Sequence, residues 1–280
     1  MDPRTHRIWR CGRFRLDLGR PLVMGVLNAT PDSFSDGGTH EDPVSAVAWG
    51  ERLAAEGADI IDVGGESTRP GSEEVPLAEE TARVRPVVTR LVDELDVPVS
   101  IDTRHAAVAQ ACVESGASII NDVSGFRDAE MVAVAAGCDA GCIVMHMLGE
   151  PKTMQAEPAY DDVVREVAGY LLAQAASLEA AGVQRDRIAL DPGIGFGKTL
   201  EHNLALLRAL PQFAELGYPL VVGVSRKRFI GELSGEERPA SRLGGSVAAA
   251  LASVRGGADV VRVHDVAAMV QALAVDSALR

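Results

Sequence analysis

The stretch Met24–Gly38, MGVLNATPDSFSDGG, joins an apolar run to a long polar loop. The apolar run begins at Leu22 and shows no alternation of polar and apolar residues, which is typical of a strand buried on both faces. It stops at Asn28, so an amide side chain is expected at the end of this strand. The residues that follow are common in turns, but functional groups also concentrate on loops held by rigid scaffolds. The stretch alone therefore predicts either a simple turn or a binding loop.

The same cycle of strand, loop and helix recurs along the chain. Strict alternation implies a parallel sheet with right-handed crossovers, and eight units in about 250 residues fit a closed (β/α)8 TIM barrel of the α/β class. A doubly wound open sheet is the alternative. Eight strands are expected, at Leu22–Leu27, Asp59–Val63, Val97–Ile101, Ser118–Ile120, Cys142–Met145, Arg187–Leu190, Pro219–Val224 and Asp259–Val263. Helices are expected at about 41–56, 76–95, 105–115, 128–137, 161–182, 200–216, 241–256 and 265–279.

Two local features refine this expectation. Residues 7–19 alternate loosely around Gly12 and predict a short β-hairpin that covers one end of the core. Pro86 predicts a kink or a break in the helix expected at 76–95. Because no composition shift marks a boundary, the chain is expected to be a single barrel domain over residues 1–280, with 1–20 as a hairpin extension.

Composition excludes several classes of protein. The net charge of −13 argues against a nucleic-acid binder, which would carry a basic face. No apolar run approaches the ~18–20 residues that a membrane span needs, and the N-terminus lacks the apolar segment of a signal peptide. The four cysteines show no zinc-ligand spacing. A cytoplasmic protein without a membrane or nucleic-acid partner is therefore expected.

A polar residue stands at or near the carboxyl end of each expected strand. In a (β/α)8 barrel the active site lies at the carboxyl ends of the strands, so these side chains are expected to line one pocket. The carboxylates and amides would suit a heterocycle rich in N–H donors, whereas Lys227 and Arg262 make the other side of the pocket basic. Arg262 and His264 lie two residues apart and are expected to clamp a phosphate. The eight strand-end residues are Asn28, Asp62, Asp102, Asn121, His146, Asp191, Ser225 and His264.

Two motifs fail on inspection. The segment Gly193–Thr199, GIGFGKT, resembles a nucleotide P-loop, but the first glycine of that motif would have to stand where Pro192 is. Ser225 lacks the GxSxG elbow of a hydrolase nucleophile. Neither segment therefore predicts nucleotide binding or hydrolysis.

Seven segments together carry a family resemblance: MGVLNATPDSFSDGG, DVGGESTRPG, SIDT, NDVSG, LDPGIGFGKT, GVSRKRFIG and RVHDV. Their order is similar to that in dihydropteroate synthases, and the resemblance runs from about Leu22 to the C-terminus. It implies one pterin-binding domain that condenses 6-hydroxymethyl-7,8-dihydropterin diphosphate with para-aminobenzoate, which gives 7,8-dihydropteroate and diphosphate in folate biosynthesis.

The resemblance also implies roles for single residues. Asp102, Lys227 and Asp36 would be catalytic, and Asn28 would bind Mg²⁺ and, with Arg262 and His264, the diphosphate. The implied pterin ligands are Asp102, Asn121, Met145, Asp191, Phe196 and Lys227. The implied para-aminobenzoate ligands are Phe34, Thr68, Arg69, Pro70, Ser225 and Lys227. Phe34 and Asp36 stand in the polar loop after Asn28, which is expected to close over bound substrates.

The resemblance also implies a site that sulfonamide inhibitors target, because they are similar to para-aminobenzoate, and a homodimer formed through the late helices. Two alternatives remain at this point. A methyltetrahydrofolate–corrinoid methyltransferase would share the barrel and the pterin-holding residues, and a non-catalytic paralogue would bind pterin without turnover. The intact first loop, STRPG segment and basic residues favour the synthase, because these groups serve a diphosphate and an aromatic amine.

Overall fold

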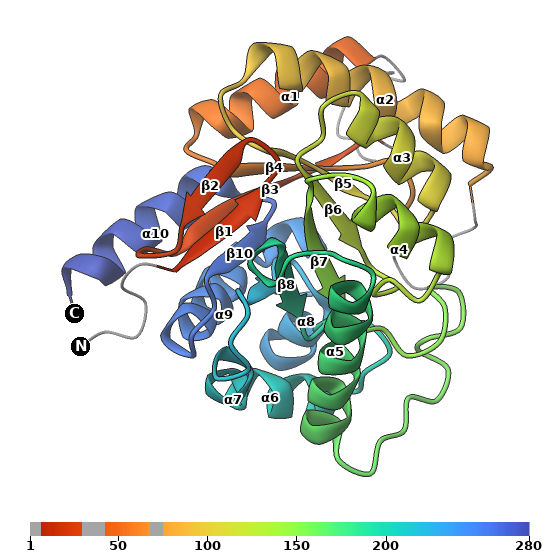
Figure 1. Cartoon of the computed structure of the whole chain (residues 1–280). Helices are drawn as coiled ribbons and strands as arrows, with labels where there is room; N and C mark the ends of the chain where they lie inside the picture. Colours follow the sequence, from red (N-terminus) through yellow and green to blue (C-terminus); the bar gives the residue numbers. More distant parts are fainter. Residues whose placement is uncertain (1–6, 30–42, 68–74, 280) are drawn as a thin grey trace.

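Eight parallel strands form the centre of the computed structural model, which describes residues 7–29, 43–67 and 75–279 (Figure 1). They follow one another around the barrel in the order β8-β7-β6-β5-β4-β3-β10-β9. The two outer strands meet through a parallel bridge between Leu190 and Leu220, so the sheet closes on itself. The predicted barrel is confirmed and the open sheet is excluded. The strands are β3 (Leu22–Asn28), β4 (Ile60–Gly64), β5 (Val99–Asp102), β6 (Ile119–Asp122), β7 (Gly141–Met145), β8 (Ile188–Asp191), β9 (Val221–Gly223) and β10 (Val260–Val263).

Helices surround the barrel and depart from the expected pattern in three places. The helix that contains Pro86 is not interrupted there, and the expected helix 200–216 is divided at Ala209, with Pro211 in the first turn of the second part. A short helix after β9, Arg228–Ser234, was not expected, because this segment is rich in polar residues and glycine. The helices are α1 (Pro43–Ala55), α2 (Leu77–Glu94), α3 (Ala106–Glu114), α4 (Ala129–Ala136), α5 (Val163–Ala180), α6 (Leu200–Arg208), α7 (Leu210–Ala214), α8 (Arg228–Ser234), α9 (Leu243–Arg255) and α10 (Val266–Ala278).

The barrel interior is apolar at one end and polar at the other. Ile60, Ile119 and Val260 belong to one fully buried cluster near the amino ends of their strands. Two residues further along the same strands come Asp62, Asn121 and Arg262, which point to the same side because strand side chains alternate. The polar layer therefore lies nearer the carboxyl ends of the strands than the apolar cluster, and this is the end at which barrel enzymes bind their substrates.

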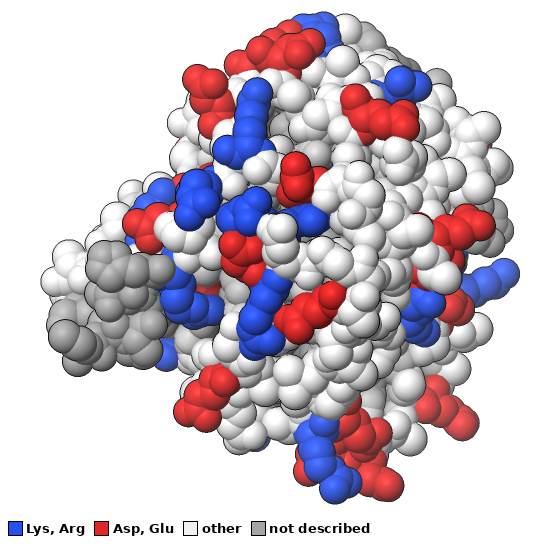
Figure 2. All heavy atoms as spheres, in the orientation of Figure 1, with Lys and Arg blue, Asp and Glu red and all other residues white. Residues whose placement is uncertain are grey.

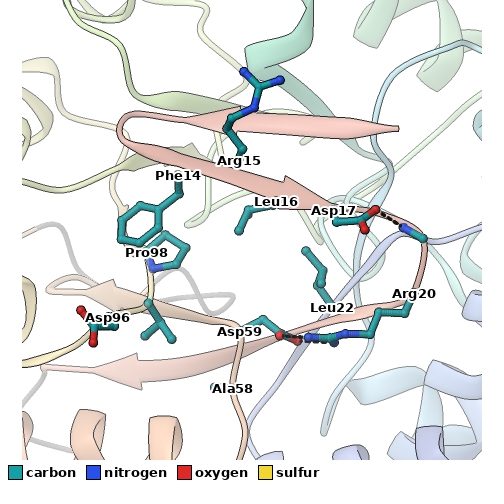
Figure 3. Close-up of a pocket in the computed structure, with 12 residues that line it drawn as sticks. Phe14, Arg15, Leu16, Asp17, Arg20, Leu22, Ala58, Asp59, Asp96 and Pro98 are labelled. Atoms are coloured by element: carbon teal, nitrogen blue, oxygen red, sulfur yellow. Dashed lines mark hydrogen bonds and ion pairs between the residues drawn. The ribbon is translucent and has the colours of Figure 1, made fainter. Parts of the chain in front are cut away.

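An N-terminal hairpin closes the apolar end. Strands β1 (Ile8–Cys11) and β2 (Phe14–Asp17) pair antiparallel, and the buried Trp9 packs into the interior cluster while its indole N–H donates to the carbonyl of Arg187 at 3.0 Å. The predicted hairpin and its covering role are confirmed. A pocket lies between β2 and the segments that enter β3, β4 and β5, with Phe14 beside Pro98 and an Arg20–Asp59 ion pair (Figure 3). This pocket is at the end opposite to the polar layer.

The surface shows charges of both signs. On the face drawn in Figure 2, basic and acidic side chains lie interspersed around the hairpin, without a continuous basic field. The mixture of signs on this face is found in a chain whose net charge is −13. Within the described ranges, none of the helices has the length and apolar character that crossing a membrane requires.

Candidate active site

An arginine between two carboxylates occupies the middle of the polar layer. Arg262, on β10, donates from Nε to Oδ2 of Asp62 and from Nη2 to Oδ2 of Asp102, both at 2.6 Å. The same Oδ2 of Asp62 accepts a hydrogen bond from Nδ2 of Asn121 at 3.2 Å. Four strands, β10, β4, β5 and β6, therefore contribute to one hydrogen-bonded network across the barrel mouth.

This network leaves acceptors open. Oδ1 of Asp62 and Oδ1 of Asp102 are buried, and among the described residues neither has a hydrogen-bond partner. Burial raises the pKa of Asp102 to about 7; the charge of Arg262 opposes this shift and the charge of Asp62 adds to it. Unpaired buried acceptors are costly in a folded protein, and a ligand that brings N–H donors would satisfy them.

A lysine and an aromatic ring form the adjacent wall. Lys227 donates from Nζ to the carbonyl of Ile194, and the same nitrogen lies 4.7 Å from the centre of the Phe196 ring. Burial lowers the pKa of Lys227 to about 8, although the charge of Asp191 opposes this shift. Phe196 packs against the cluster that contains Met145. This wall combines an apolar flat surface with a cation, which suits an aromatic ligand that carries polar edges.

Asp191 ends β8 and is nearly fully buried. One of its oxygens accepts from the backbone N–H of Gly193 at 2.7 Å, and burial raises the pKa of its carboxyl above the ordinary value. The structure thus brings together all six predicted pterin ligands, with Arg262 in the same layer.

The other predicted ligands that the structure describes lie at the rim. His264 follows β10, and its Nδ1 is 3.0 Å from Oγ of Ser225 at the end of β9. Arg262 instead reaches inward to β4 and β5, so the two residues of the predicted clamp contact different partners in this state. Asn28 is the last residue of β3 and is in register with Gly64, which in turn is in register with Asp102.

The turn after Asp102 is fixed by a buried glutamate on α2. Glu80 accepts from Oγ1 of Thr103 at 2.7 Å and contacts Nδ1 of His105 at 2.6 Å. The hydrogen bond to Glu80 raises the pKa of His105. Glu66, Glu80 and His105 lie close enough to hold a metal ion, but Arg104 also pairs with Glu66 at 3.3 Å. A cation would have to displace these ion pairs, so the cluster is better described as a support for the turn.

Five predicted site residues lie outside the described part of the chain. Two of them come after β3 in the sequence and three come after β4. They are Phe34, Asp36, Thr68, Arg69 and Pro70.

Sequence reasoning missed two residues of this site. It gave Asp62 no role beyond that of a strand-end residue, yet a carboxylate inside the run Ile60–Gly64 is itself a signal, because buried strands seldom carry an unpaired charge. It also gave Lys198 no role in the site, yet this side chain is 3% exposed and lies beside His146. Lysine occurs only three times in the chain, and this rarity was the signal that could have identified Lys198.

Comparisons with known proteins agree with this geometry. A family model described as "Pterin binding enzyme" matches residues 24–264. The dihydropteroate synthase of Neisseria meningitidis serogroup B is 52% identical, and the match covers 98% of each chain. The chain belongs to the dihydropteroate synthase family.

Solved structures of dihydropteroate synthases share the whole fold. One from Xanthomonas albilineans, with 4-aminobenzoic acid, has a TM-score of 0.93, is 48% identical and covers 98% of each chain. Another, from Burkholderia cenocepacia, complexed with 7,8-dihydropteroate, has a TM-score of 0.89 at 49% identity and covers 98% of this chain and 96% of its own. Because these matches extend along nearly the whole chain, the hairpin and the barrel both belong to the family's architecture.

Proposed function

We propose that the chain catalyses the condensation of 6-hydroxymethyl-7,8-dihydropterin diphosphate with para-aminobenzoate to give 7,8-dihydropteroate and diphosphate. The observation that carries this proposal is the polar layer of the barrel, where open carboxylate oxygens stand beside an aromatic wall and two cations. The ligands of the two related solved structures, 4-aminobenzoic acid and 7,8-dihydropteroate, are a substrate and a product of this reaction.

The pterin ring would lie between the apolar wall and the carboxylates. Its ring and amino N–H groups would donate to Asp102 and Asp191, and Asn121 would supply an amide that both donates and accepts. Met145 and Phe196 would cover the faces of the ring, and this is supported by their packing in one buried cluster. Recognition then rests on a few polar contacts in a largely preformed slot.

Departure of diphosphate is the step that the cations would assist. Arg262 and His264 stand at the end of β10, where negative charge would develop on the leaving group. The methylene carbon left on the pterin becomes electron-poor as its C–O bond breaks. Asp102, held by Arg262 close to the pterin slot, would stabilise that positive charge until the amine of para-aminobenzoate attacks. Ser225 and Lys227 border the side from which the amine would approach.

A Mg²⁺ ion fits the donors that the described residues offer. Asn28 supplies one neutral amide oxygen at the end of β3, and Mg²⁺ in such sites takes most of its remaining ligands from water and substrate phosphates. When bound, the ion would neutralise charge on the diphosphate and so improve it as a leaving group.

The decisive assay mixes the purified chain with pterin diphosphate, para-aminobenzoate and Mg²⁺ and follows dihydropteroate by chromatography. Folded protein that forms no product would refute the proposal. A single-turnover measurement of diphosphate release then tests the role of Asp102: Asp102→Asn should release diphosphate far more slowly than the parent chain. An unchanged release rate would remove Asp102 from this step. Competition by a sulfonamide against para-aminobenzoate is expected in the same assay.

The proposal also includes an oligomeric state and a cellular compartment. Apolar side chains are exposed late in the chain, at Leu243, Val275 and Leu279, and support a homodimer formed through this region. A monomeric mass at micromolar concentration would contradict it. Free cysteines, three of them buried, support a reducing compartment such as the cytoplasm.

A further inference from the structure

The segment Gly193–Thr199 is wrapped tightly against the chain that follows β7. Gly193, Gly195 and Gly197 all have positive φ, at +66°, +87° and +62°. A Cβ atom on Gly193 would overlap the carbonyl oxygen of His146. Only glycine combines this backbone conformation with such a close approach, so the segment is built to lie against its neighbour.

The buried side chain of Lys198 links this segment to His146 through hydrogen bonds. It is 3% exposed, and its Nζ lies 3.0 Å from Nδ1 of His146, 3.3 Å from the carbonyl of the same residue and 2.9 Å from the carbonyl of Phe196. An ammonium group has three N–H donors, and three acceptors surround it here. Among the described residues no carboxylate lies within ion-pair distance of this ammonium, so its three hydrogen bonds and the nearby charge of Asp191 compensate its burial.

The imidazole is neutral in this arrangement. Nδ1 of His146 can accept from Lys198 only if the proton of the ring is on Nε2. Burial, together with the charge of Lys198, lowers the pKa of His146 to about 3, which agrees with a neutral ring. Burial likewise lowers the pKa of Lys198 to about 7, although Asp191 opposes this shift.

The segment Gly193–Thr199 carries both partners of Lys227. The carbonyl of Ile194 accepts from Nζ of Lys227, and the ring of Phe196 faces the same nitrogen. The carbonyl of Phe196 is itself one of the acceptors of Lys198. The ammonium of Lys227 is therefore placed by a segment whose own position depends on Lys198.

We propose that Lys198 is a positioning residue for pterin binding: it holds Gly193–Thr199 against His146 and thereby sets Phe196 and Lys227 at the pterin slot. Lys198 itself does not touch the ligand. This inference rests on the proposed function and extends it to a residue outside the predicted ligand set.

The test is a double-mutant cycle on pterin affinity. Lys198→Met keeps an unbranched side chain that reaches as far as Cε of lysine, but it removes the ammonium group and with it all three hydrogen bonds. Titration calorimetry with 6-hydroxymethylpterin should give a dissociation constant raised roughly tenfold, the equivalent of one ordinary hydrogen bond. In a Lys227→Met background the same substitution should change affinity by clearly less than in the parent chain, because the part of its effect that passes through Lys227 is already lost and only the part through Phe196 remains. Additive losses in the double variant would overturn the proposal, as would a Lys198→Met variant with parental affinity.

Two controls separate this role from simple support of the fold. Lys152→Met removes an exposed lysine and should leave the affinity unchanged. Lys198→Gln retains two N–H donors, so the affinity of this variant for 6-hydroxymethylpterin should fall between those of the parent and of Lys198→Met. If the Met variant does not fold, Lys198→Gln serves as the test in its place. ¹⁵N chemical shifts should report an unprotonated Nδ1 on His146 in the parent chain and a changed Nδ1 environment in Lys198→Met; an unchanged shift would contradict the contact. Failure of the parent chain to bind pterin would instead refute the proposed function.

Discussion

Replacing Asp102 with asparagine should stabilise the folded chain at high pH while it impairs turnover. Asp102 is buried next to Asp62, and Arg262 divides its guanidinium between the two carboxylates. The pKa of Asp102 is therefore raised to about 7, from 3.8 for an unperturbed aspartate. Above that pH the folded protein must hold an ionised carboxylate that the unfolded chain would expose to water.

The size of the effect follows from proton linkage. Because the folded state keeps this proton at a higher pH than the unfolded state, Asp102 makes the free energy of unfolding fall as the pH rises from about 4 to about 7. At 1.36 kcal/mol per pKa unit, the full loss is about 4 kcal/mol, of which about 2 kcal/mol falls between pH 5.5 and pH 8.5. The asparagine side chain of the variant does not titrate, so the stability of Asp102→Asn relative to the parent should rise by about 2 kcal/mol across this interval.

Urea unfolding followed by circular dichroism at pH 5.5 and pH 8.5, with chelator present, measures this difference. The groups that face Asp102 are Arg262, Asp62, Glu80 and Asp122, and they are common to both proteins. Glu157→Gln removes an exposed carboxylate and should show no such pH dependence. If the stability difference between Asp102→Asn and the parent were the same at both pH values, Asp102 would titrate normally and the electrostatic reasoning would be refuted.

Three further outcomes are expected. Asp62→Asn should lower kcat on the order of a hundredfold, because the substitution removes the carboxylate charge that orients Arg262 and Asn121. Ser100→Ala, on the neighbouring strand, should stay near parental activity, and equal rates for the two variants would contradict this reasoning. Trp9→Ala should lower the free energy of unfolding by about 3–5 kcal/mol in urea titrations, since it empties the apolar end of the barrel and breaks a buried hydrogen bond. Chelation of Mg²⁺ should abolish turnover but leave the affinity for 6-hydroxymethylpterin unchanged in calorimetry, since the proposed pterin ligands include no metal; a loss of both would place the ion in the pterin slot.

The architecture could be predicted from the sequence because one local signal repeats. Each strand is a mostly apolar run with a polar residue at or near its carboxyl end, and the eight runs were expected within a few residues of their observed bounds. The sequence did not decide how two prolines act. Pro86 lies inside α2, which is not broken there, whereas Pro211 lies in the first turn of α7. The two residues have the same backbone restriction, and only the packing around each helix decides whether it continues.

The site was less predictable, because the sequence shows which side chains reach the barrel mouth but not how they pair. Arg262 and His264 were expected to act together from their spacing, yet Arg262 contacts Asp62 across the barrel and His264 contacts Ser225 beside it. Such pairings depend on the barrel's closure, which joins residues as far apart as 62 and 262. No local spacing rule contains that information.

The charges of the barrel mouth explain why the substrate, and not the protein, completes this network. Asp62, Asp102 and Asp191 bring three carboxylates into one layer, against the two cations Arg262 and Lys227. With all five groups ionised the layer carries a net negative charge, and two of its carboxylate oxygens stay without a donor. A neutral ring with several N–H donors satisfies those oxygens, and a carbon that becomes positive during the reaction meets the excess charge. The arrangement is costly to the empty protein and favourable to the transition state, which is the condition for binding energy to accelerate a reaction.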